Sequence, residues 1–285
     1  MSERMTAHAL KGAKGHTPLV WITAYDYTQA QLAEEAGVDV ILVGDSVGTT
    51  VMGYTSTIPV TLDHMVYHAT LVRRGAPNTM MVVDLPFLTY TNAQDALKHA
   101  GRIMQDTLAD AVKLEGGRRV LDAVESLVRH DIPVVGHLGL TPQSVHRLGG
   151  YRVQARTRDS IKDLLEDARA LTNAGICALV LEGIPDRVAA FVTQEISVPT
   201  IGIGAGNQTD GQVLVFHDCV GLSPHLPKFA KPFADARTAI LTGLGQYREA
   251  VQARTFPDDD HSYHITDKEW QAFWSDITHR SPSPS

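Results

Sequence analysis

Cysteine is nearly absent from this chain. Only Cys177 and Cys219 occur among the 285 residues, and no CxxC spacing is present. Because a structural zinc site or a disulfide framework needs several cysteines at close spacing, the sequence supports neither. Cys177 lies within the apolar run ICALVLE, where we expect a small core residue.

An excess of positive charge is also missing. The 25 Lys and Arg residues are outnumbered by 32 Asp and Glu, for a net charge of -7. Nucleic-acid-binding domains present a basic face, so no nucleic-acid partner is expected. No apolar run approaches the roughly 20 residues of a membrane helix. The first residues lack the apolar segment of a signal peptide, so we expect a cytoplasmic protein without membrane contact.

Short apolar runs alternate with helical patterns along the chain. About eight such alternations in 285 residues predict a (β/α)8 TIM barrel with extra N- and C-terminal helical segments. A doubly wound open sheet is the structural alternative. A helix is predicted at Gly211–His217, just before the last strand. The predicted strands are Leu19–Thr23, Val40–Val43, Met80–Val83, Ala111–Leu114, Pro133–Gly136, Ala178–Leu181, Pro199–Ile203 and Cys219–Leu222.

No internal repeat or low-complexity linker divides the chain. We therefore assign residues 1–255 to one barrel domain and residues 256–285 to a polar C-terminal extension. The segment before the first strand is a candidate to cap the bottom of the barrel.

Four acidic residues stand at the carboxyl ends of predicted strands: Asp45, Asp84, Glu115 and Glu182. Parallel strands bring these ends to one face, so a shared pocket is expected. Crowded carboxylates repel one another, and a divalent cation relieves that repulsion. For any single acid, capping of the following helix is the alternative, but the repetition favours a pocket.

Lys113 and Glu115 are two residues apart in the predicted strand AVKLE, so both side chains point into the barrel. A buried lysine is unfavourable unless it is paired or binds an anion. One reading is an internal ion pair with Glu115 or Asp84. The functional reading is that Lys113 receives a substrate carboxylate.

Asp45 and Asp84 come from neighbouring strands, and their hard oxygen ligands favour Mg²⁺ over zinc. Glu115 is a third candidate ligand, directly or through water. Ser46 follows Asp45 and can donate a hydrogen bond to a ligand oxygen.

His137 ends the fifth predicted strand and is either a pocket residue or a core residue. Glu182 lies across the barrel from the metal candidates, which suits a general base, with an N-cap-like anchor as the alternative. The glycine-rich segment Pro199–Gln212 fits either a phosphate cradle or tight packing.

These segments resemble the ketopantoate hydroxymethyltransferase family. The likeness is carried by TAYDYTQA, VGDSVGTTVMGYTSTIPVTLDHM, VVDLPF, VKLEGG, GHLGLTPQSV, LEGIP and IGIGAGNQTDGQVLV, which together cover most of residues 23–221. The resemblance implies a barrel of the phosphoenolpyruvate/pyruvate type that depends on Mg²⁺. It also implies a homo-oligomer, typically a decamer.

The resemblance further implies a reaction. A hydroxymethyl group would pass from 5,10-methylenetetrahydrofolate to 3-methyl-2-oxobutanoate through a Mg²⁺-stabilised enolate, giving 2-dehydropantoate for pantothenate biosynthesis. By the same likeness Asp45, Asp84 and Glu115 resemble the metal site and Glu182 the proton acceptor. The ketoacid site corresponds to Asp45, Ser46, Asp84, Lys113 and, near the substrate, His137.

Two other functions compete with this one. A carbon–carbon lyase of the same barrel group would use similar enolate chemistry, but such enzymes often carry a reactive cysteine in a loop, and none is seen here. A non-catalytic metabolite-binding barrel would explain the glycine-rich segment. It would not explain the inward Lys113 or the four strand-end acids.

Overall fold

The computed structural model describes residues 4–150 and 152–278. Contacts between residues divide the chain into two compact units, Met1–Ala234 and Asp235–Ser285. The first unit holds all the strands of the described chain. The domain boundary expected at residue 255 stays a prediction.

Eight parallel strands close into a barrel in the first unit. Each strand is hydrogen-bonded to the next in sequence, and β8 returns to β1. The predicted (β/α)8 barrel is therefore confirmed, and the open-sheet alternative is wrong. The strands are β1 (Leu19–Thr23), β2 (Val40–Val43), β3 (Met80–Asp84), β4 (Ala111–Glu115), β5 (Val134–Gly139), β6 (Ala178–Glu182), β7 (Thr200–Ile203) and β8 (Gly211–Leu214).

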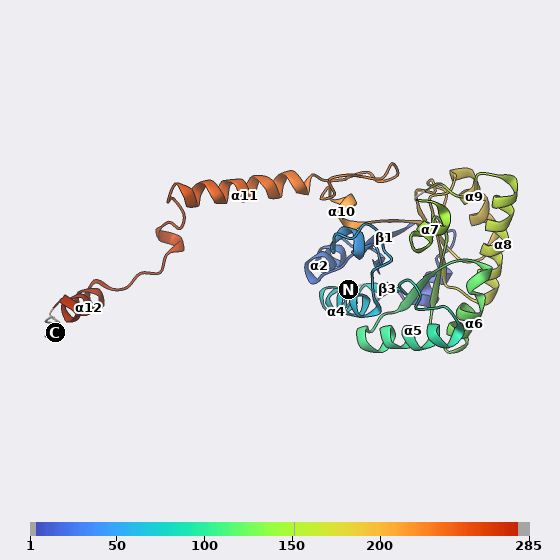
Figure 1. Ribbon diagram of the computed structural model, residues 1–285, viewed down its shortest axis with the longest axis horizontal. Helices are drawn as coiled ribbons and strands as arrows, with labels where there is room; N and C mark the ends of the chain where they lie inside the picture. Colours follow the sequence, from blue (N-terminus) through green and yellow to red (C-terminus); the bar gives the residue numbers. More distant parts are fainter. Residues whose placement is uncertain (1–3, 151, 279–285) are drawn as a thin grey trace. The chain divides into compact units, whose positions relative to one another are not determined.

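One helix precedes the first strand, and the others follow the strands around the barrel. The helices are α1 (Ala7–Gly12), α2 (Tyr27–Glu35), α3 (Val47–Thr50), α4 (Leu62–Gly75), α5 (Ala93–Thr107), α6 (Leu121–Arg129), α7 (Val145–Leu148), α8 (Arg158–Ala174), α9 (Asp186–Glu195) and α10 (Phe216–Cys219), with short 3-10 helices η1 (Arg118–Val120) and η2 (Pro142–Ser144). Figure 1 shows α4, α5, α6, α8 and α9 around the strands. Thr61 caps α4 by accepting a hydrogen bond from the His64 N–H.

The eighth strand lies earlier in the chain than expected. The helix predicted at Gly211–His217 is wrong, because its first four residues form β8 and Phe216 begins α10. The strand predicted at Cys219–Leu222 is also wrong, because α10 ends there at Cys219. Closure of the barrel explains the difference. Gly211 sits between β1 and β7, where a Cβ atom would lie 2.6 Å from the Leu19 carbonyl oxygen. Only pairing with distant strands makes this short segment a strand.

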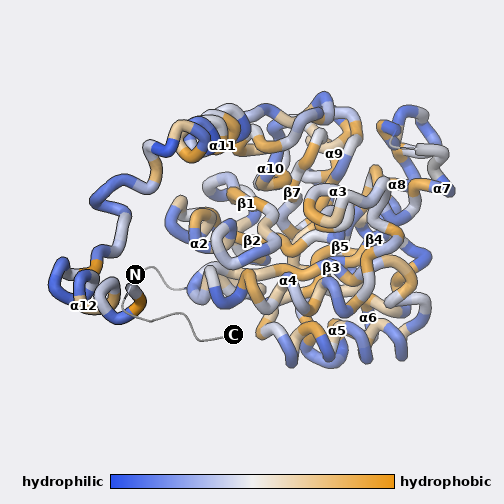
Figure 2. The backbone as a smooth tube through the Cα atoms, turned by 60° about the vertical axis from the view of Figure 1, so that its left-hand side comes forward, coloured by the Kyte–Doolittle hydropathy of each residue, from blue (hydrophilic) through white to orange (hydrophobic). Residues whose placement is uncertain are grey.

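Apolar side chains form two layers of core. The larger cluster fills the space between strands and helices, and the smaller one fills the barrel interior, where Trp21 and Cys177 are buried. Leu10 of α1 is fully buried in that inner cluster, so α1 caps the barrel as expected. Figure 2 shows apolar colour along β3, β4 and β5, with hydrophilic outer turns on α5 and α6.

The second unit contains α11 (Ala236–Gln252), η3 (Asp259–His261) and α12 (Asp267–Thr278). The sequence pattern does not predict α12 within the polar extension. Its aromatic residues Trp270, Phe273 and Trp274 are exposed. The last seven residues of the extension lie outside the described residues. Among the residues that the structure describes, no helix is long and apolar enough to span a membrane.

Candidate active site

A cavity of about 800 Å³ opens at the carboxyl ends of the strands. All seven residues predicted for the site line this cavity, although they come from five successive strands or the turns after them. They are Asp45, Ser46, Asp84, Lys113, Glu115, His137 and Glu182. The sequence hypothesis that the strand-end acids share one pocket is therefore confirmed in its geometry, while their chemical roles stay predictions.

Lys113 lies at the centre of the polar contacts in the cavity. Its side chain is buried, and Nζ lies 3.0 Å from Asp84 Oδ1 and 3.2 Å from His137 Nδ1. Burial disfavours the lysine charge, but the Asp84 and Glu115 carboxylates outweigh it and raise the pKa of Lys113. The ion pair with Asp84, one of the alternatives from sequence, is present.

The lysine also determines the protonation of His137. An ammonium group has only hydrogen atoms to donate, so His137 Nδ1 must accept and Nε2 must carry the ring proton. Burial and the neighbouring Lys113 hold the pKa of His137 well below its usual value, which keeps the ring neutral. Nε2 lies 3.2 Å from Glu182 Oε2 but has no hydrogen-bond partner of good geometry. His137 thus presents an N–H beside Glu182.

Two carboxyl groups of the site have pKa values near neutrality. Burial, followed by the negative charge of Asp84, raises the pKa of Asp45 to about 7. Burial raises the pKa of Glu182 to about 7, partly offset by Lys113. Burial and the Asp45 charge also raise the pKa of Glu115. A carboxylate with a pKa near 7 is suited to accept and return a proton at neutral pH.

Gln143 connects the carboxylates and was missed by the sequence analysis. Its Nε2 donates to Asp45 Oδ2 at 2.7 Å and to the Leu85 carbonyl at 3.0 Å. Its backbone N–H donates to Glu115 Oε2 at 3.0 Å, and its Oε1 accepts from the Tyr90 hydroxyl at 2.5 Å. The available signal was the short segment TPQS after the fifth strand, which forms η2 and turns Gln143 into the barrel.

Tyr25 is a second residue that the sequence analysis did not assign. It is fully buried, and its hydroxyl lies 2.7 Å from Ser46 Oγ. This contact orients the Ser46 hydroxyl at the edge of the cavity. The only signal in the sequence was the position of Tyr25 just after the first strand.

The donor set at Asp45 and Asp84 fits a divalent cation. Asp84 Oδ1 is buried and accepts no hydrogen bond, although it pairs with Lys113. Across residues 4–150 and 152–278, no group of three or more His, Cys, Asp and Glu side chains lies close enough to hold a metal ion alone. Mg²⁺ takes only one or two protein carboxylates and keeps water or substrate oxygens, so two are sufficient. Ligation by Glu115, whose Oε2 accepts from Gln143, stays a prediction.

Other features weighed from sequence have structural explanations. Cys177 is buried, donates its thiol hydrogen to the Val134 carbonyl, and has a pKa raised to about 12 by burial, so it is no nucleophile. In the glycine-rich segment, a Cβ at Gly204 would lie 2.9 Å from the Phe229 ring, and one at Gly206 would lie 2.6 Å from the Asp186 Cβ. Close packing accounts for both glycines.

Most of the chain is similar to known proteins of one family. Residues 4–259 match the family model described as ketopantoate hydroxymethyltransferase. The 3-methyl-2-oxobutanoate hydroxymethyltransferase of Geobacillus kaustophilus is 49% identical over 90% of this chain and 93% of that protein. The enzyme of the same name from Thermus thermophilus is 49% identical over 91% of this chain and 100% of its own length.

Solved structures share the fold at much lower sequence identity. Phosphonopyruvate hydrolase in complex with oxalate and Mg²⁺ has a TM-score of 0.60 at 14% identity, covering 97% of each chain. A 2,3-dimethylmalate lyase of the PEP mutase/isocitrate lyase superfamily has a TM-score of 0.58 at 18% identity, covering 95% of this chain and 98% of its own. These similarities confirm the barrel type and carry no argument about the reaction.

Proposed function

Because the chain belongs to the ketopantoate hydroxymethyltransferase family, it is a transferase enzyme, and we propose that it transfers a hydroxymethyl group from 5,10-methylenetetrahydrofolate to 3-methyl-2-oxobutanoate. The product is 2-dehydropantoate, on the route to pantothenate. The observation that supports this reaction is a single cavity lined by the buried Lys113 and His137, the partly buried Glu182, and the carboxylates of Asp45 and Asp84. By family likeness we further propose a cytoplasmic homo-oligomer, a decamer.

The ketoacid carboxylate binds Lys113 and Ser46 in this proposal. Lys113 is the buried cation of the cavity, and carboxylates form strong charge-assisted hydrogen bonds with ammonium groups. Ser46, oriented by Tyr25, donates a second hydrogen bond. The Nε2–H of His137 then lies beside the substrate and Glu182.

Asp45 and Asp84 would hold Mg²⁺, with Glu115 as a further ligand directly or through water. When bound, the cation supplies positive charge that stabilises an enolate.

Glu182 removes the proton from C3 of the ketoacid, because its raised pKa makes it a competent base near neutral pH. C3 then forms a bond to the methylene carbon of the donor. The two bonds from that carbon to folate nitrogens are replaced by the bond to C3 and by one to the oxygen of water. The proton from C3 and one proton from water end on the folate nitrogens.

Proton exchange tests the proposal directly. The protein is incubated with 3-methyl-2-oxobutanoate in D₂O, with and without Mg²⁺, and the C3 proton is followed by NMR before the folate donor is added. We expect Mg²⁺-dependent loss of the C3 proton signal, followed by product once the donor is present. Absence of both exchange and product would reject the reaction.

A further inference from the structure

A second cavity of about 450 Å³ lies beside the strand ends, between the loops after β4 and β5 and the first turns of α8. Three arginines line it: Arg118, Arg119 and Arg147. A third cavity of about 290 Å³ is lined by Arg119 and also by Glu115 and Gln143, which belong to the candidate active site. The second cavity therefore adjoins the active site through Arg119.

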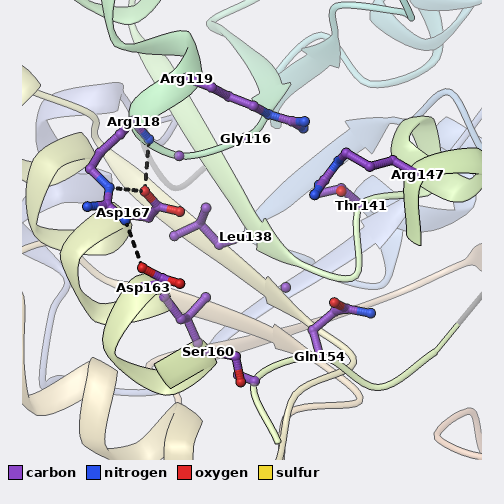
Figure 3. A pocket seen from close by; sticks show the side chains of 14 residues that line it. Gly116, Arg118, Arg119, Leu138, Thr141, Arg147, Gln154, Ser160, Asp163 and Asp167 are labelled. Carbon is purple, nitrogen blue, oxygen red and sulfur yellow. Dashed lines mark hydrogen bonds and ion pairs between the residues drawn. The ribbon is translucent and has the colours of Figure 1, made fainter. Parts of the chain in front are cut away.

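The charges of these arginines are not equivalent. Arg118 is neutralised by Asp163, Glu166 and Asp167 of α8, as the dashed lines to Asp163 and Asp167 in Figure 3 show in part. Within the part of the chain that the structure describes, Arg119 and Arg147 form no ion pair. Their guanidinium groups extend toward the same part of the cavity in Figure 3. Partial burial, followed by repulsion from the Arg119 charge, lowers the pKa of Arg147. Two like charges held together there favour an anionic ligand.

Thr141 supplies an independent indication of a ligand. Its side chain is 3% exposed and lines the cavity, yet its hydroxyl oxygen has no hydrogen-bond partner among the described residues. Buried hydroxyl groups are nearly always paired, so an unpaired one that faces a cavity indicates a missing partner. In Figure 3, Thr141 lies beside the end of the Arg147 side chain.

The position of Arg119 follows from the glycines after β4. A Cβ atom on Gly116 would lie 2.8 Å from Arg119 Nε, so the arginine lies across the backbone immediately after Glu115. Arg119 follows Glu115 by four positions, which limits their Cα atoms to about 14 Å apart. Thr141 likewise follows His137 by four positions. The subsite therefore lies within reach of a ligand that also occupies the active site.

We propose that Arg119, Arg147 and Thr141 bind a carboxylate of the glutamate tail of the folate donor. This inference rests on the proposed function, because it requires a folate donor. Guanidinium groups bind carboxylates through paired hydrogen bonds, and a serine or threonine hydroxyl adds one donor. The tail binds at the rim, which leaves the one-carbon end of the donor free to reach the ketoacid at the centre of the barrel.

Donor truncation tests this subsite. Steady-state kinetics are measured with methylenetetrahydrofolate and with the corresponding methylenetetrahydropteroate, which lacks glutamate. Arg119→Gln and Arg147→Gln should each raise KM for the folate by about ten-fold, as expected for loss of a charge-assisted contact. Thr141→Val should raise it less, and Arg119→Lys should restore part of the loss. For the pteroate donor, wild type and variants should have equal KM values.

Arg129→Gln is the matched control, because it removes the same charge from an exposed position at the end of α6. Inorganic phosphate is the probe for a free anion. If phosphate competes with the folate donor in the wild type and this competition is lost in Arg119→Gln, the subsite is supported. If phosphate binds but leaves the KM for the folate donor unchanged, the bound phosphate is an adventitious ion only and the proposal is overturned. Unchanged KM in both arginine variants, or an equal rise for both donors, also overturns it. Exchange of the C3 proton of the ketoacid needs no folate donor. If this exchange persists while the folate KM fails to change as expected, only the tail-binding subsite is rejected and the proposed reaction is not.

Discussion

Replacement of Gln143 by methionine isolates the hydrogen bonds that hold the candidate active site together. Gln143 is buried, and its side chain joins Asp45, the Leu85 carbonyl and the Tyr90 hydroxyl. Methionine has a similar volume and flexibility but none of these hydrogen-bonding groups, so the cavity contribution is small. The backbone hydrogen bond to Glu115 remains.

The expected loss follows from those three contacts. The bond to the Asp45 carboxylate contributes about 1.5–3 kcal/mol, and each of the two neutral bonds contributes about 0.5–1.5 kcal/mol. Since the apolar methionine chain recovers part of this, we expect a loss of about 3 kcal/mol in the free energy of unfolding. For a domain of this size that corresponds to a fall in Tm of about 6–12 °C. Gln143 also lowers the pKa of Asp45, so in Gln143→Met the acid limb of the activity profile moves to higher pH.

Thermal unfolding at constant protein concentration measures the first effect, and the pH dependence of kcat/KM measures the second. Gln194→Met, on the exposed side of α9, is the matched control and should change the free energy of unfolding by less than about 0.5 kcal/mol. If Gln143→Met unfolds within about 1 °C of the wild type and keeps its pH profile, the reasoning about this network is wrong.

Four further predictions concern the base, the pH dependence of stability, the metal and the backbone. Glu182→Gln should lower turnover by at least about 100-fold while Mg²⁺ binding persists. Glu125→Gln, at an exposed position of α6, is the control and should keep full turnover. Full turnover in Glu182→Gln would reject the assignment of Glu182 as the base. Without added cation, the free energy of unfolding should fall as the pH rises from about 4 to about 7, because folded Asp45 and Glu182 retain protons that the unfolded chain releases. Mg²⁺ should raise Tm more at pH 8 than at pH 6, since Asp45 must ionise to bind it, and an equal rise in Asp45→Asn would contradict this. Gly139→Ala should destabilise the protein by at least about 3 kcal/mol, because φ at Gly139 is +95° and the new Cβ would lie 2.2 Å from the Glu182 carbonyl oxygen. Gly101→Ala, in open space on α5, is the control and should stabilise the protein by up to about 1 kcal/mol. Chemical denaturation measures both changes, and similar effects of the two substitutions would contradict the argument.

The barrel and most of its site were predictable because they depend on local periodicity. Apolar runs identify seven of the eight strands, and the two-residue spacing of Lys113 and Glu115 places both side chains inside the barrel. The carboxyl ends of parallel strands share one face by geometry, which brings Asp84 and Glu182 to the same cavity. The eighth strand was misplaced, because Gly211–Leu214 (GQVL) contains only two large apolar residues and exposes Gln212, so it shows no apolar run; its pairing with β1 and β7 becomes visible only in the closed barrel.

By itself, the sequence determined the class of fold, the family and the residue types gathered at the strand ends. The tertiary structure decided which of these residues touch one another. Gln143 binds Asp45 across 98 positions of the chain, and Tyr25, which follows β1, reaches Ser46, which follows β2. The pairing of Arg118 with α8, which leaves Arg119 without a carboxylate partner among the described residues, is likewise a contact between distant segments. Periodicity reports only the face of an element on which a side chain lies, whereas its partners depend on how the closed barrel packs its loops.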